Sequence, residues 1–140
     1  MKLKINDQPT WVSSPTGPVL VRPFQVVVPV ALIADGRCSV SFPAILDTGN
    51  SHNFCLSDVQ LRDWVGLPLK ITGTAKINGV LVPLARADLS VEGRVWHCPD
   101  GVVVYPDGHP ASPRLPLLGL RTLVRNNVRV LIENGEVTLG

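Results

Sequence analysis

Three dipeptides that favour tight turns, each between runs of branched apolar residues, constrain this chain more than any other feature. They are Asp35-Gly36, Asn78-Gly79 and Asn134-Gly135. Such pairs are typical of two-residue β-hairpin turns, in which both positions adopt positive φ angles. Thirteen prolines and twelve glycines are also many for a helical bundle. The sequence therefore predicts a mostly β fold built around three hairpins.

The expected strands follow from the apolar runs beside these turns and from shorter Val-rich runs elsewhere. They cover residues 24–34, 37–46, 53–56, 69–77, 80–89, 93–97, 101–105, 128–133 and 136–139. Two short helices are expected, at residues 58–65 and 120–125. The first should begin at Ser57 or Asp58 and end at Gly66, because Pro68 prevents its continuation.

The 140 residues suit a single domain, residues 1–140, with no internal repeat and no linker. Its core is expected to span residues 24–139. Four prolines in residues 1–23 predict an irregular segment, apart from a short strand near 2–5. Four more prolines predict a loop over residues 106–116.

Charge and cysteine content exclude several classes of protein. A net charge of +2 is too small to indicate nucleic-acid binding, and no aromatic residues alternate with the late arginines. The longest apolar run is too short for a membrane helix, and the N-terminus lacks the apolar segment of a signal peptide. Cys38, Cys55 and Cys98 make an odd count without framework spacing. We therefore expect reduced thiols in a cytoplasmic protein that contacts neither membrane nor nucleic acid.

The most informative polar residue is Asp47, which follows directly after the apolar run of the second predicted strand. Burial at a strand end disfavours the charged form of a carboxylate, so neighbouring groups must compensate. Thr48 offers a hydroxyl, and Gly49 lets the backbone turn closely around the acid. A carboxylate held in this way is a candidate general acid or base.

The segment Ile45-Leu46-Asp47-Thr48-Gly49-Asn50-Ser51 resembles the active-site loop of the retropepsin-like aspartic proteases. Leu117-Leu118-Gly119 resembles the second motif of that family, which is followed by a helix. The hairpin over residues 72–84 lies where the family has its flap, and the hairpin over residues 128–139 also has a counterpart. The resemblance covers roughly residues 24–139 and is nearer to bacterial members than to viral ones. It implies a retropepsin-like acid-protease β-barrel.

The resemblance also implies the chemistry, in which two carboxylates share one proton and activate a water against a peptide bond. This chain has a single Asp-Thr-Gly, so the second Asp47 must come from another copy in a two-fold homodimer. Thr48 would hydrogen-bond across that dimer, and Gly49 would donate its amide to the carboxylates. The residues expected to bind a polypeptide substrate are Asn50, Ser51, Thr74, Ala75, Lys76, Asn78, Gly79 and Leu118.

Three positions depart from the family pattern. Asn50 stands where Ala or Ser is usual, and Ser51 and Leu120 replace an Asp and an Arg that pair in many retroviral members. Both partners of that pair are absent together, so no buried charge is left alone. The alternative function is a catalytically inactive dimerisation or peptide-binding module with the same fold.

Two other kinds of site, a metal site and a Cys–His nucleophile, have little support in the sequence. His52, Cys55, His97 and Cys98 are metal-binding residue types, but their spacing matches no recognised pattern. A Cys–His nucleophile has no third residue to orient it, and Cys55 is expected to be a small core residue. We therefore expect neither a metal nor a cofactor.

Overall fold

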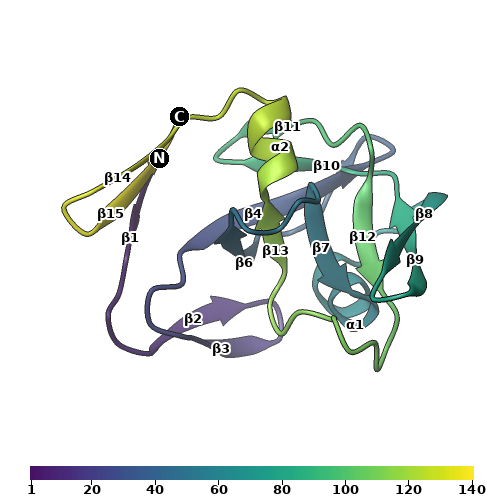
Figure 1. Cartoon of the computed structure of the whole chain (residues 1–140), viewed down its shortest axis with the longest axis horizontal. Helices are drawn as coiled ribbons and strands as arrows, with labels where there is room; N and C mark the ends of the chain where they lie inside the picture. Colours follow the sequence, from purple (N-terminus) through teal and green to yellow (C-terminus); the bar gives the residue numbers. More distant parts are fainter.

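The computed structural model describes all 140 residues, and its chain folds mainly into strands (Figure 1). Strands hold 49% of the residues and helices 10%, which confirms the mostly β class and the two short helices. No helix has both the length and the apolar character needed to cross a membrane.

Most strands belong to one long sheet of ten strands, in which β5 (Arg37–Cys38) pairs only with β4. All neighbours are antiparallel except two parallel pairs, β6 with β13 and β7 with β12. In spatial order, the other nine strands are β11 (Arg94–Trp96), β10 (Asp88–Val91), β4 (Val27–Ala34), β6 (Phe42–Asp47), β13 (Leu117–Gly119), β7 (Phe54–Ser57), β12 (Val102–Tyr105), β9 (Val80–Ala85) and β8 (Ile71–Ile77).

The path of this sheet does not close on itself. Its two ends, β11 and β8, pair only with β10 and β9, so the strands form no closed barrel. The expected barrel is therefore reduced to an open, mostly antiparallel sheet.

The N-terminal segment is more regular than the sequence predicts. The short strand expected near residues 2–5 is present as β1 (Lys2–Lys4), which joins β15 (Glu136–Leu139) and β14 (Val130–Glu133) in a three-stranded sheet. Strands β2 (Thr10–Ser14) and β3 (Gly17–Val21) form a separate hairpin. The prediction of an irregular segment was wrong because Pro15 lies in the turn and Pro18 lies on a strand with only one neighbour, where proline is tolerated.

The three turn dipeptides behave as predicted. Asp35-Gly36, Asn78-Gly79 and Asn134-Gly135 have positive φ at both positions, and each joins two antiparallel strands. The strand predicted over residues 37–46 is interrupted, however. The Ser39 hydroxyl accepts a hydrogen bond from the Leu32 amide at 3.0 Å and so replaces a regular backbone pairing.

The first helical segment consists of a short α-turn, α1 (Asp58–Gln60), continued by a π-turn, η1 (Leu61–Val65). The side chains of Ser57 and Gln60 each accept from the other's backbone amide, which forms a capping box. Gly66 ends the segment with a φ of 66°. The second helix, α2 (Leu120–Arg125), has the predicted bounds.

The main core lies along the long sheet and includes Leu32, Phe54, Leu118 and Trp64. A smaller cluster of Cys55, Val82, Val103 and Tyr105 lies beneath the β8–β9 hairpin. Cys55 connects the two regions because it follows Phe54 in β7. Strand β7, which follows the Asp47 loop, therefore places side chains in both clusters.

Candidate active site

The site is built where β13 lies between β6 and β7, the two strands that precede and follow the Asp47 loop. On one side Gly119 pairs with Asp47 and Leu118 pairs with Leu46, in parallel. On the other side Leu118 pairs with Phe54, antiparallel. The segment from Thr48 to Asn53 therefore has to pass over the end of β13, which fixes the place of Asp47 in the fold (Figure 1).

Backbone hydrogen bonds hold the loop to the strand that it crosses. The Gly119 amide donates to the Asn53 carbonyl at 3.0 Å, and the Leu120 amide donates to the Asn50 carbonyl at 2.8 Å. The Asn50 amide in turn donates to the Asp47 carbonyl at 3.1 Å. The loop is thus tied at both its middle and its end.

Position 119 must be a glycine, because the backbone of the crossing loop leaves no room for a side chain. A β-carbon added there would lie 1.9 Å from the His52 carbonyl oxygen and 3.1 Å from the Asn50 carbonyl oxygen. Both are backbone atoms and cannot rotate away. The sequence marks Gly119 as part of a motif, and the structure supplies the steric reason for the glycine.

The Asp47 carboxylate is half-buried, and the Gly49 amide donates to its Oδ1 at 3.1 Å. This is the amide contact that the family resemblance implies for Gly49. Thr48 and Ser51 are exposed, and their hydroxyls make no hydrogen bond within the chain. The Thr48 hydroxyl beside Asp47 therefore has no partner within the chain.

The titratable groups around Asp47 favour neutral forms. Burial, and secondarily the Arg121 charge, lower the pKa of His52. Burial also raises the pKa of the Cys55 thiol to about 11 and that of the Tyr105 phenol to about 12. A buried thiol with so high a pKa is a poor nucleophile, which argues against Cys–His chemistry here. Asp47 is the one acid of the loop.

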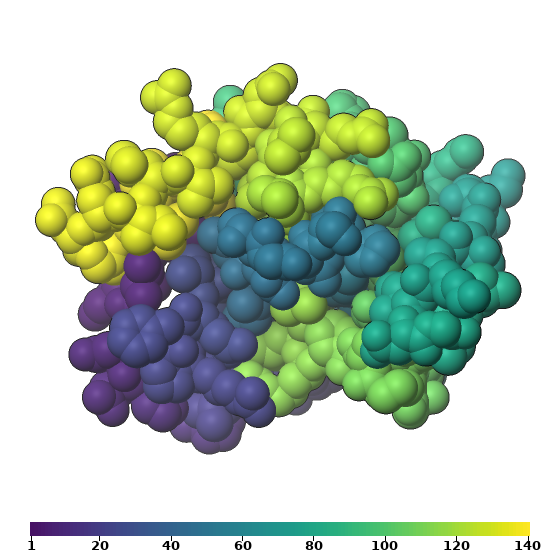
Figure 2. Space-filling model, in the orientation of Figure 1, coloured from purple at the N-terminus to yellow at the C-terminus, as the bar shows by residue number.

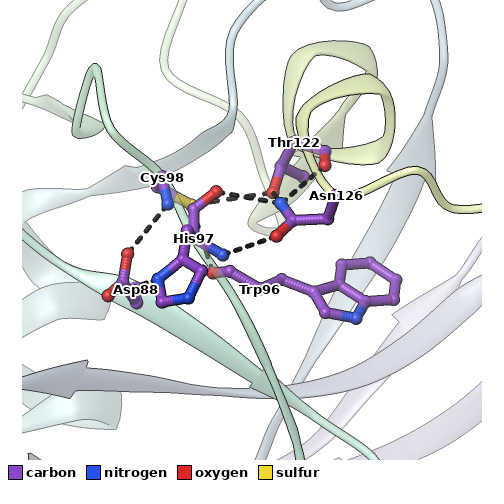
Figure 3. A network of polar contacts seen from close by, with 6 residues as sticks. All are labelled: Asp88, Trp96, His97, Cys98, Thr122 and Asn126. Carbon is purple, nitrogen blue, oxygen red and sulfur yellow. Dashed lines mark hydrogen bonds and ion pairs between the residues drawn. The ribbon is translucent and has the colours of Figure 1, made fainter.

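Helix α2, which starts beside the loop, is fixed at its other end by a polar network (Figure 3). Asn126 Oδ1 accepts from the His97 amide at 2.8 Å, and its Nδ2 donates to the carbonyls of His97 and Thr122. The Cys98 amide donates to Asp88 Oδ1 at 2.8 Å, and the Cys98 thiol lies 3.7 Å from the Thr122 hydroxyl. These contacts join α2 to β10 and to the segment after β11.

The hairpin predicted over residues 72–84 is present as β8–β9 at the edge of the long sheet (Figure 1). Thr74, Lys76, Asn78 and Gly79 are exposed, and Ala75 is half-buried. No hydrogen bond joins this hairpin to the Asp47 loop. Its inner residues instead pack on the small cluster that contains Cys55.

One predicted contact residue is not accessible. The Leu118 side chain is 0% exposed and packs in the main core. The expectation that Leu118 binds substrate was therefore wrong for its side chain. Leu117, its neighbour in β13, is half-buried and packs on the small cluster.

The sequence offered little sign of two other residues near the crossing. Asn53 is 1% exposed, and its Nδ2 donates to the Gly101 carbonyl at 3.1 Å. Tyr105 is buried beside Cys55 in the small cluster. A polar residue at the start of an apolar run was the only indication that Asn53 is structural.

The surface hollows of the chain lie away from Asp47, and none is lined by a residue of its loop. His, Cys, Asp and Glu side chains form no cluster of three or more that could hold a metal. His52 and Cys55 are at the loop, whereas His97 and Cys98 belong to the network around α2. No protein-family model matches the sequence, and a search of curated proteins gives no significant match.

Proposed function

We propose that this chain is an aspartic endopeptidase with a retropepsin-like fold, active as a homodimer in which two Asp47 carboxylates face each other. The observation that carries the proposal is the position of Asp47 at the end of β6, paired with Gly119 and hydrogen-bonded by the Gly49 amide. Such an arrangement presents a carboxylate on a rigid element with one oxygen already oriented.

The chemistry follows from two like charges at close range, which cannot both ionise easily. The pair shares one proton. The ionised carboxylate takes a proton from a water, which attacks the carbonyl carbon of an extended peptide, while the protonated one donates to the carbonyl oxygen. Thr48 hydrogen-bonds across the dimer axis, and the β8–β9 hairpin closes over the substrate and excludes water.

A face suited to a second copy surrounds the loop. Figure 2 displays the segment around residue 50 (blue) below α2 (yellow-green), with the C-terminal hairpin (yellow) on the same face. Leu120 and Val124 of α2 are exposed, as are Leu131 and Ile132 of β14. Strand β14 also has a free edge, because it pairs only with β15. Exposed apolar residues beside an unpaired edge favour association with another chain.

The lack of a hollow at Asp47 agrees with this proposal. A single carboxylate on an open surface neither encloses a peptide nor holds the second acid that the chemistry needs. In the proposed dimer the groove is formed between the two subunits and their hairpins. The substrate is then a polypeptide in extended conformation, and no metal or cofactor takes part.

The test is cleavage of a peptide library between about pH 4 and 7, with and without pepstatin. We expect cleavage by the wild type, and its complete loss in Asp47→Asn with the fold and the dimer retained. Asp100→Asn is a matched control, because Asp100 is a partly exposed acid that pairs with Arg121 and Arg125 and lies outside the loop. Cleavage by purified Asp47→Asn would refute the proposal. A dimeric wild type that cleaves no peptide would favour the inactive binding module.

A further inference from the structure

Asn50 departs from the usual residue after Asp-Thr-Gly, and its side chain turns back into the loop. Its Oδ1 accepts from the His52 amide at 2.9 Å. Its backbone carbonyl accepts from the Leu120 amide, and its backbone amide donates to the Asp47 carbonyl. One residue therefore connects the acid, the far side of the loop and the start of α2.

The other end of the Asn50 amide reaches the buried thiol of Cys55. The distance from Nδ2 to Sγ is 3.5 Å, within the range of a hydrogen bond to sulfur. Cys55 is 0% exposed and packs with Val82, Val103 and Tyr105 beneath the β8–β9 hairpin. The Asn50 side chain thus links the Asp47 loop to the cluster on which the hairpin rests.

We infer that Asn50 is a positioning residue: it fixes the Asp47 loop by bridging the His52 amide and the Cys55 thiol. This inference rests on the proposed function, and it changes the role first expected for Asn50 from substrate contact to loop support. A side-chain amide fits both partners because it carries an acceptor for an N–H and a donor for a neutral thiol.

Other side chains satisfy only part of this arrangement. A serine at position 50 has an acceptor for the His52 amide but is too short to span both partners. An aspartate keeps the acceptor, loses the donor and adds a negative charge close to Asp47. An alanine leaves the half-buried His52 amide without its partner, which has a free-energy cost and frees the loop.

These differences define the kinetic test. In Asn50→Ala we expect kcat to fall about 10- to 100-fold with a smaller change in KM, because a misplaced reacting group lowers the rate of the bound complex. The kcat of Asn50→Ser should lie between that of Asn50→Ala and that of the wild type. In Asn50→Asp the added charge opposes ionisation of the catalytic pair, so the acidic limb of the pH–rate profile should move to higher pH. Because an added charge acts on the pair whatever Asn50 does, the split between kcat and KM in Asn50→Ala is the readout that separates positioning from a purely structural role.

The control is Asn126→Ala, which removes a structural asparagine of similar connectivity from the network around α2. We expect it to lower the unfolding temperature without shifting the pH–rate profile. All rates are measured at a temperature where circular dichroism shows each variant to be folded. Unchanged kcat and pH profile in every Asn50 variant would overturn the inference.

A second readout does not depend on activity. Hydrogen exchange of the His52 amide, followed by NMR, should be about tenfold faster or more in Asn50→Ala than in the wild type. The same comparison in an Asp47→Asn background should give the same ratio. A wild type that cleaves no peptide overturns the proposed function alone, and the His52 exchange rate then decides whether Asn50 orders the loop. Unchanged exchange would overturn the loop-ordering role.

Discussion

Gly119 pairs with Asp47 across β13 and β6, and its α-carbon faces the backbone of the loop that Asp47 begins. The pairing places the acid, and the missing side chain makes room for the loop that orients it. The two residues are thus parts of one structural unit, although they lie far apart in the sequence.

Gly119→Ala should destabilise the protein strongly. The new β-carbon would overlap the His52 carbonyl, so strands β13 and β6 or the loop must separate, at a cost of about 3 kcal/mol or more. Urea unfolding followed by tryptophan fluorescence measures the change. Gly73→Ala is the matched control, because its β-carbon would meet only Leu84 Cδ1 at 3.8 Å and its φ is not positive. A similar decrease in the free energy of unfolding in both variants would contradict the steric explanation.

The protein should lose stability at alkaline pH. Burial raises the pKa of Cys55 from 9.0 to about 11, that of Cys98 from 9.0 to about 12 and that of Tyr105 from 10.0 to about 12. The unfolded chain therefore releases these protons first. Stability is full below about pH 9 and falls up to about pH 12, with a limiting slope of about 1.4 kcal/mol per pH unit for each group.

Urea unfolding between about pH 7 and 10 tests this dependence. Cys98→Ala should reduce the slope above about pH 9, whatever its effect at neutral pH. Cys38→Ala, which removes an exposed thiol, is the control for loss of a cysteine. Equal slopes for wild type and Cys98→Ala would show that burial of this thiol does not govern the alkaline limb.

The proposed interface makes a separate prediction. Val124→Glu in α2 and Ile132→Lys in β14 each place a charge on a residue that is exposed in the single chain, at 65% and 67%. If these faces meet in a dimer, each variant should raise its dissociation constant about tenfold or more, and the rate of cleavage should fall with dimer content. Sedimentation equilibrium measures the constant at stated concentrations.

Val40→Glu is suited as the control for these two variants. Val40 is 64% exposed and lies in the segment between β5 and β6, so it belongs to neither α2 nor β14. Its substitution should leave the dissociation constant within error. A dimer that tolerates both Val124→Glu and Ile132→Lys would have to use another face.

Local sequence predicted the parts of this fold that depend on neighbouring residues. The turns at Asp35-Gly36 and Asn78-Gly79 and the end of the first helical segment at Gly66 follow from backbone preferences alone. The prediction for residues 1–23 was wrong because it relied on the number of prolines. Composition does not reveal that Pro15 lies in a turn and that Pro18 lies on a strand with only one neighbour. Ser39 likewise replaces a backbone pairing that no local pattern shows.

The candidate site was predictable in its residues more than in its geometry. Asp47, Gly49 and Gly119 belong to motifs that can be read along the chain. The contact of Asn50 with Cys55 and the burial of Leu118 depend instead on how β13 lies between β6 and β7. Such pairings join distant segments, and the sequence around each residue does not specify them.

The insertion of β13 between β6 and β7 has a consequence for synthesis. A ribosome delivers Asp47 well before β13, the strand that holds its loop. Contacts between such distant segments also form late in folding. A nascent chain that does not yet include β13 therefore carries the acid without the support that would orient it. If the proposed chemistry is correct, a nascent copy cannot orient its Asp47 for catalysis until β13 has been made.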